Sequence, residues 1–152
     1  ESNLPKFRGG SPIQNQIIRG IIKTKSTAFF MNSELDAGKI LLQKDLSLEG
    51  TLDEIFLRME KNNYNLITKI ISGKFKPSSQ KGKPTFYKRR KPVESELKNL
   101  NHSKLYLHNF IRMLADPYPN AYIKIGKKKI IFKSSKLSGK KLSFEGVIEW
   151  IF

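Results

Sequence analysis

Isoleucines near the start of the chain recur at the three-to-four-residue spacing of a helix, which predicts a short helix over 12–19. Ser11 stands in the position of its N-cap, and Pro12 in the first helical position, where a proline loses no hydrogen bond. Gly20 follows as a C-terminal stop. The isoleucines that form the pattern are Ile13, Ile17 and Ile18.

A longer run of helically spaced apolar residues follows Thr51. Thr51 and Glu54 have the spacing of a capping box, in which each side chain accepts a hydrogen bond from the other residue's backbone N–H. The apolar positions continue past Asn62 and Asn63 to Gly73, which predicts one long or kinked helix whose apolar face belongs to the core.

β-branched and aromatic residues predict two strands on either side of a short polar turn. The strands are expected over 26–32 and 39–48, and the turn over 33–38. This arrangement predicts an antiparallel hairpin with Asp36 near its tip. A carboxylate in such a turn can orient and stabilise an imidazolium, although aspartate is also common as an ordinary turn residue.

The composition of the chain changes after Gly73. Lys, Pro, Ser, Gln and Gly dominate residues 74–92, which predicts a basic linker between a first domain over 1–73 and a second over 93–152. We expect the second domain to begin with helices and to continue as antiparallel strands. The helices are predicted over 93–100 and 103–115, and the strands over 121–125, 130–134 and 143–151.

The charge of the chain indicates which class of partner it could bind. Lys and Arg number 29 against 13 Asp and Glu, a net charge of +16, and such an excess attracts nucleic acid, nucleotides and acidic membranes. Lysines that only keep the surface solvated explain the charge equally well. The group that bears on a nucleic-acid partner is Lys124, Lys127, Lys128, Lys129, Lys133, Lys136, Lys140 and Lys141.

Several classes of site are excluded or disfavoured by the sequence. It contains no cysteine, which excludes disulfides and thiol nucleophiles. His102 and His108 stand in no metal-ligand spacing, so we expect no metal site. No apolar run approaches the ~18 residues of a membrane span, and the first residues lack a signal-peptide pattern, so we expect a cytoplasmic protein without a membrane partner. The sequence predicts no particular oligomeric state.

A basic segment with aromatic residues is a candidate binding site. Phe86 and Tyr87 precede four consecutive cations that include Arg89 and Arg90. Guanidinium groups suit phosphate, and aromatic rings offer a stacking face. The segment therefore suits a nucleotide diphosphate or an RNA backbone, with a solvated basic strand as the alternative.

Two motifs near the start of the chain occur at a specific spacing. S-x-L-P-x-x-R-G runs from Ser2 to Gly9, and L-D-x-G-x-I runs from Leu35 to Ile40. Together they resemble the formyltransferase family that uses 10-formyltetrahydrofolate, which includes methionyl-tRNA formyltransferases, sugar-nucleotide amine formyltransferases and the glycinamide ribonucleotide enzymes. Residues 110–122 resemble the segment that joins two domains in this family, which argues against the glycinamide ribonucleotide branch.

The resemblance implies an α/β fold, namely the C-terminal part of a Rossmann-like formyltransferase domain followed by a small β-rich domain like an open barrel. It implies that Asp36 is catalytic and supports a histidine that, with an asparagine, would precede Glu1 in the family pattern. We therefore expect this chain to be a C-terminal part that is inactive alone. The other implied site residues are Ser2, Leu4, Pro5 and Gly38 for the folate co-substrate, and Arg8, Gly9, Arg89 and Arg90 for the acceptor.

The identity of the acceptor amine stays open. The stretch K-R-R-x-P-x-x-S over 88–95 looks more like the amino-sugar enzymes, so we favour the amine of a nucleotide-linked amino sugar. Methionyl-tRNA is the alternative, favoured by the net charge. A third hypothesis is a non-catalytic basic module that binds nucleic acid.

Overall fold

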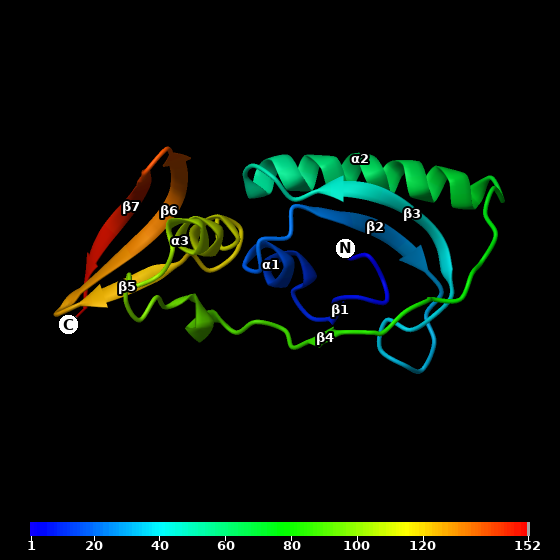
Figure 1. Ribbon diagram of the computed structural model, residues 1–152, viewed down its shortest axis with the longest axis horizontal. Coiled ribbons are helices and arrows are strands. Elements are labelled where there is room, and N and C mark those ends of the chain that lie inside the picture. Colours follow the sequence, from blue (N-terminus) through cyan, green and yellow to red (C-terminus); the bar gives the residue numbers. More distant parts are fainter. Residues whose placement is uncertain (152) are drawn as a thin grey trace. The chain divides into compact units, whose positions relative to one another are not determined.

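The structure is a computed structural model that describes residues 1–151, and it divides into two compact units (Figure 1). The first unit holds Glu1–Gln16 and Ile21–Arg89, and the second holds Ile17–Gly20 and the chain from Arg90 onward. Both units combine helices with small sheets, in agreement with the predicted α/β class.

A two-stranded antiparallel hairpin is the central sheet of the first unit. Its strands are β2 (Lys23–Phe29) and β3 (Ile40–Ser47), paired from Lys23 opposite Ser47 to Phe29 opposite Ile40. The prediction placed the first strand three residues later, because the apolar run through Met31 is typical of a strand. In the structure the register shifts between Ala28 and Phe29, and Met31 is exposed in the connection.

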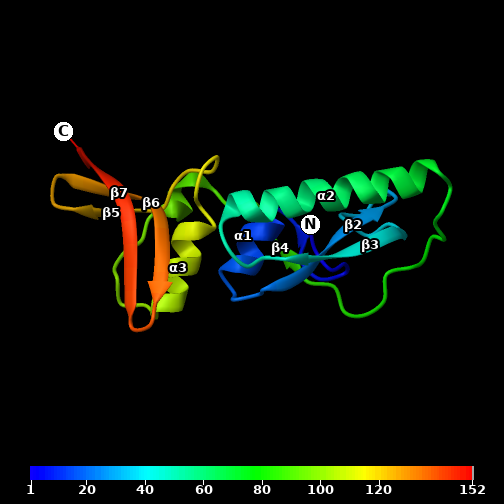
Figure 2. The ribbon, with the colours of Figure 1, turned by 90° about the horizontal axis from the view of Figure 1, so that it is seen from above.

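Helix α2 (Leu52–Ile71) packs on this hairpin (Figures 1 and 2). The predicted capping box is confirmed: the Glu54 amide donates to Thr51 Oγ1 at 3.3 Å, and the Thr51 amide donates to Glu54 Oε2 at 2.8 Å. The helix continues unbroken through Asn62, because this side chain is buried and donates to the backbone carbonyl of Asp45 at 2.9 Å. The apolar core of the unit includes Leu46, Leu48, Leu52, Ile55 and Leu66, and each such side chain contributes about 1.5–3 kcal/mol by leaving water.

Helix α1 (Pro12–Ile17) begins at the predicted proline and ends two residues earlier than expected. Ser11 has a φ of 49°, which lies outside the extended conformation typical of an N-cap, so that part of the prediction is wrong. Gly20 has a φ of 73°, and its amide donates to the carbonyl of Ile17 at 2.9 Å, which closes the end of the helix.

Residues 74–89, where the composition predicts a linker, pair with the first unit in the structure. Strand β1 (Arg8–Gly9) runs parallel to β4 (Phe86–Tyr87), and Ile40 and Ser78 exchange backbone hydrogen bonds of 2.8 and 2.9 Å. The structural division therefore falls after Arg89. Main-chain pairing helps to hold this polar, proline-containing segment, and composition does not record such pairing.

The second unit contains η1 (Pro92–Ser95), α3 (Lys104–Arg112) and an antiparallel sheet in the order β5 (Tyr122–Ile125), β6 (Lys128–Ser138) and β7 (Lys141–Trp150). Helix α3 packs on β6 and has Ser103 as its N-cap. The predicted helix over 93–100 is reduced to the single turn of η1, because Glu96 bridges to Tyr122 and the Leu97 amide donates to the Tyr122 carbonyl at 2.7 Å. Main-chain pairing with a strand excludes the helical conformation there.

Candidate active site

The structure brings the two sequence motifs into direct contact. Asp36 lies in the connection between β2 and β3, and its Oδ2 accepts a hydrogen bond of 2.7 Å from the backbone N–H of Gly9. Asp36 has a φ of 50°, in the left-handed region that aspartate tolerates better than most residues. The predicted carboxylate and the predicted loop are therefore parts of one site.

The glycines of the first motif allow close approach between chain segments. Gly9 has a φ of 99°, and a Cβ added there would lie 2.3 Å from the carbonyl oxygen of Tyr87. A Cβ on Gly10 would lie 2.3 Å from Cα of Arg89. Both distances are far below van der Waals contact, so only glycine lets β1 lie beside residues 87–89.

Arg8 is buried and contacts groups of the same unit. Its Nε and Nη2 donate to the side-chain oxygen of Gln80 at 3.2 and 2.7 Å, and its guanidinium lies 5.7 Å from the ring centre of Phe86. Gln80 in turn donates through Nε2 to the carbonyls of Asp36 at 2.8 Å and Gly38 at 2.9 Å. The sequence analysis missed Gln80, because a lone glutamine in a polar stretch gives no signal of periodicity or motif.

The other residues assigned to the folate co-substrate lie beside the same hairpin. Ser2, Leu4 and Pro5 are buried. The Ser2 carbonyl accepts a hydrogen bond of 2.6 Å from Thr27 Oγ1 on β2. Gly38 is buried as well, and a Cβ there would lie 1.6 Å from the carbonyl oxygen of Phe30. Of these residues, Gly38 belongs to the connection that carries Asp36, and its carbonyl accepts from Gln80.

An open hollow of about 400 Å³ adjoins Asp36. Its lining combines apolar side chains with the polar groups of the β2–β3 connection, as expected of a small-molecule site. The lining residues are Phe29, Met31, Asn32, Ser33, Glu34, Leu35 and Asp36.

The two arginines assigned to the acceptor fall in different units. Arg89 is exposed at the end of the first unit, with its backbone against Gly10. Arg90 belongs to the second unit, where its Nη2 donates to the Glu94 carbonyl at 2.7 Å and its guanidinium lies 5.8 Å from the ring centre of Phe110. The structure thus gives consecutive arginines separate surroundings.

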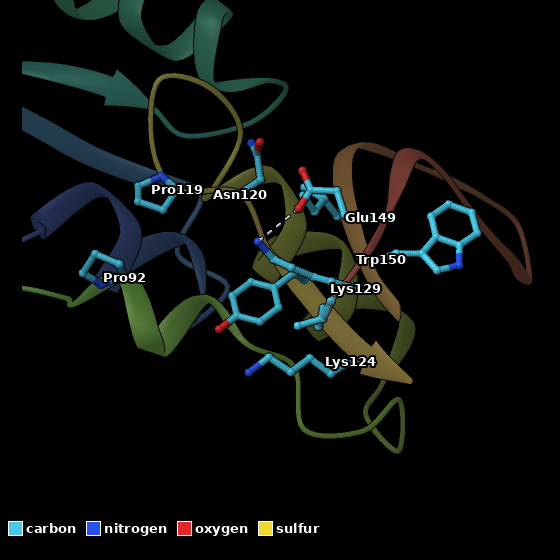
Figure 3. Close-up of a pocket in the computed structure, with 10 residues that line it drawn as sticks. Pro92, Pro119, Asn120, Lys124, Lys129, Glu149 and Trp150 are labelled. Atoms are coloured by element: carbon cyan, nitrogen blue, oxygen red, sulfur yellow. Dashed lines mark ion pairs between the residues drawn. The ribbon is translucent and has the colours of Figure 1, made fainter. Parts of the chain in front are cut away.

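A second hollow, of about 760 Å³, lies in the second unit at one end of its sheet (Figure 3). Lys124, Lys129 and Glu149 are cross-strand neighbours on β5, β6 and β7. Lys129 Nζ lies 3.7 Å from Glu149 Oε2, and Figure 3 shows this ion pair with Trp150 pointing away from it. Both lysines also lie near the ring of Tyr122, at 5.8 and 4.8 Å from its centre.

The hollow therefore presents ammonium groups beside an aromatic ring, a combination that suits a phosphate and a base. Its lining residues are Pro92, Pro119, Asn120, Tyr122, Lys124, Lys129, Ile131, Glu149, Trp150 and Ile151.

The histidines take no part in either hollow. His108 Nδ1 lies 2.9 Å from Ser135 Oγ, and burial, aided by the charge of Arg112, lowers the pKa of His108. Among residues 1–151, His, Cys, Asp and Glu side chains form no group of three that could hold a metal ion. The helices of this described part are too short or too polar to span a membrane.

Comparison with known protein families defines the class of this chain. Residues 1–71 match the family described as formyl transferase, and residues 92–148 match the methionyl-tRNA formyltransferase C-terminal domain. The chain belongs to the formyltransferase family. This confirms the resemblance and the predicted order of a formyltransferase domain followed by a β-rich C-terminal domain.

Two methionyl-tRNA formyltransferases are similar to this chain over most of its length. The methionyl-tRNA formyltransferase of Ligilactobacillus salivarius is 37% identical over 135 residues, which cover 84% of this chain and 42% of that protein. The solved methionyl-tRNA formyltransferase from Clostridium thermocellum is 37% identical with a TM-score of 0.91, over 98% of this chain and 66% of the other. The chain thus spans less than half the length of that curated relative.

An N-formyltransferase from Helicobacter canadensis, solved in complex with folinic acid and dTDP-3-aminofucose, is more distant. It is 18% identical with a TM-score of 0.68, over 99% of this chain and 64% of the other. That likeness is one of fold.

Proposed function

We propose that this chain is part of an enzyme that transfers a formyl group from 10-formyltetrahydrofolate to the amino group of methionyl-tRNA. The observation that carries the proposal is the 2.7 Å hydrogen bond between Gly9 and Asp36, which joins the two family motifs in one site. The relatives named methionyl-tRNA formyltransferase, at 37% identity, support this acceptor.

In the proposed reaction the free amine attacks the formyl carbon, a new C–N bond forms, and the bond to the folate nitrogen breaks. The attacking amine loses a proton, the leaving folate nitrogen gains one, and the carbonyl oxygen carries negative charge in between. We assign to Asp36 the support of the imidazolium that forms while a histidine carries this proton from one nitrogen to the other, as the family resemblance implies. A carboxylate has two oxygens: Gly9 holds Oδ2, and Oδ1 is the one we assign to the imidazole.

The folate co-substrate is assigned to the hollow beside Asp36. We also assign Ser2, Leu4, Pro5 and Gly38 to the support of this co-substrate, and all four residues are buried. Glu34 and Asp36 give this hollow a negative rim, so an amino-substituted ring fits it better than a phosphate does.

The tRNA acceptor is assigned to the second unit. Lys124 and Lys129 are directly opposed across β5 and β6, and like charges in opposed positions repel each other unless a counter-charge lies near. Glu149, 3.7 Å from Lys129, and Glu96, 3.9 Å from Lys124, supply part of it, and an RNA phosphate would supply more. The sugar acceptor that the sequence favours has weaker support: Arg90 is engaged with Glu94 and Phe110 inside the second unit.

The test is a formyl-transfer assay on the purified complete gene product. Methionyl-tRNA and a dTDP-linked amino sugar are each supplied with 10-formyltetrahydrofolate. We expect product only with methionyl-tRNA, and a Km that rises steeply with salt because each phosphate contact releases counterions. Transfer to the sugar alone, or a Km for methionyl-tRNA that does not change with salt, would show that methionyl-tRNA is not the acceptor. If neither substrate is formylated, a basic nucleic-acid-binding module is favoured instead. The 152-residue chain alone serves as a control, in which we expect no turnover.

A further inference from the structure

Gln80 has its whole hydrogen-bonding capacity engaged around the candidate active site. A glutamine amide offers two N–H donors and an oxygen with two lone pairs. Here Nε2 donates to the carbonyls of Asp36 and Gly38, and Oε1 accepts from Nε and Nη2 of Arg8. The distances lie between 2.7 and 3.2 Å, so all four contacts have ordinary hydrogen-bond lengths.

These contacts close a ring of interactions. Arg8 binds Gln80, Gln80 binds the backbone of Asp36, and the Asp36 carboxylate binds the amide of Gly9. Arg8 and Gly9 are consecutive, so the ring returns to its starting point. Asp36 is thereby held at two atoms: its carbonyl oxygen by Gln80 and its Oδ2 by Gly9.

From this ring we infer that Gln80 is a positioning residue for Asp36. The inference rests on the proposed function for its catalytic consequence, because Gln80 acts through Asp36 and need not touch substrate. A φ of 50° is uncommon even for an aspartate, so contacts with neighbouring groups help to keep it. Gln80 contributes by holding the carbonyls of Asp36 and Gly38 on both sides of Ala37.

The backbone around Gln80 keeps it in reach. Ser78 pairs with Ile40 at the start of β3, and the Thr85 amide donates to the Pro5 carbonyl at 3.3 Å. The segment is thus attached on both sides of Gln80 to the two parts of the site that Gln80 joins. No other common side chain combines two donors with an acceptor at this length, since glutamate cannot donate and lysine cannot accept.

The test compares Gln80→Glu with Gln43→Glu in the complete gene product. Gln80→Glu keeps the acceptor for Arg8 but loses both donors to the Asp36 turn. Gln43 lies on β3, donates to Thr27 Oγ1 at 3.1 Å and contacts neither Arg8 nor Asp36, so it is a matched control. We measure kcat, Km for both substrates, and hydrogen exchange of the Gly9 amide by NMR.

For Gln80→Glu we expect kcat to fall about tenfold or more, with Km changed less than about twofold, because misplacement of a catalytic group affects the chemical step. We expect the Gly9 amide to exchange about tenfold faster, because its acceptor is no longer held in place. In an Asp36→Asn background the Gln80 substitution should have little further effect on kcat. Gln43→Glu should leave Gly9 exchange unchanged.

Other results overturn the inference. Unchanged Gly9 exchange in Gln80→Glu, or a fall in kcat that persists in full on top of Asp36→Asn, shows that Gln80 does not act through Asp36. If the wild-type protein transfers no formyl group, the proposed function fails, and Gly9 exchange alone still decides whether Gln80 positions Asp36. If Gln80→Glu does not fold, Gln80→Met removes all four bonds without adding charge and takes its place.

Discussion

Replacing Asp36 by asparagine separates the charge of this side chain from its hydrogen bond. In the wild type the Gly9 amide donates to Asp36 Oδ2 at 2.7 Å, and the oxygen of an asparagine can accept the same hydrogen bond. A charge-assisted hydrogen bond contributes about 1 kcal/mol more than a neutral one. We therefore expect the fold to hold, with a loss of stability on the order of 1 kcal/mol.

The effect on catalysis should be much larger. Unit charges about 4 Å apart attract each other by about 4 kcal/mol at an effective dielectric constant of about 20. Losing that attraction for an imidazolium in the transition state lowers kcat roughly a thousandfold, since each 1.36 kcal/mol is about a factor of ten. A variant that folds normally but loses most of its kcat distinguishes a catalytic aspartate from an ordinary turn residue.

The assay is single-turnover formyl transfer to methionyl-tRNA by the complete gene product, with thermal unfolding in parallel. Asp45→Asn is the matched control, because Asp45 lies on the same hairpin, is exposed and pairs with Lys25 at 2.9 Å. We expect Asp45→Asn to keep wild-type turnover. Near-normal turnover in a folded Asp36→Asn variant would refute the catalytic assignment and leave Asp36 as a residue that only shapes the turn.

Three further predictions test other parts of the two units. Asn62→Ala removes the donor that the buried Ser26 hydroxyl and the Asp45 carbonyl share, so thermal unfolding should show a loss of about 1–3 kcal/mol. An unchanged melting temperature would contradict the packing. Lys129→Gln should weaken binding of methionyl-tRNA and reduce the slope of log affinity against log salt by about one, whereas the same substitution at exposed Lys61 on α2 should not. The folded-state pKa of His108 lies below the usual 6.5, so its contribution to stability is complete above that pH and is lost as the pH falls through the lowered pKa. The melting temperature should therefore fall between pH 7 and pH 5, less so in His108→Gln, and equal pH profiles would count against this role.

The sequence predicted those parts of the fold that local chemistry determines. Thr51 and Glu54 form their capping box because both partners lie within one turn of helix, and a pattern of neighbouring residues records such a contact. Asp36 could be proposed from the sequence because it lies in one of two motifs at a specific spacing, and its place between two strands follows from a local pattern. The same reasoning gave the hairpin, with an error of three residues at β2.

Long-range pairing of polar segments could not be predicted in this way. Gln80 lies 44 positions from Asp36 and 72 from Arg8, and nothing in the composition of 74–92 distinguishes it from a neighbouring serine or lysine. The helix expected over 93–100 failed for the same reason: Leu97 pairs with Tyr122, which lies well outside any local pattern. Main-chain pairing depends on where the partner segment lies, and side-chain periodicity does not report that.

The segment of Phe86, Tyr87 and the cations that follow has a sequence that suits either a binding surface or a structural role, and only its contacts distinguish the two. The rings of Phe86 and Tyr87 beside the arginines suggested a surface for stacking and phosphate. In the structure Tyr87 stacks on Phe7, with ring centres 4.9 Å apart, and Phe86 lies under the guanidinium of Arg8. These rings hold β4 against the loop that carries Gly9. Aromatic residues that stabilise the loop beside Asp36 serve any acceptor equally, so they cannot favour the sugar. Other surfaces must distinguish the two acceptors, and the lysines around Tyr122, Lys124 and Lys129, are the ones to test.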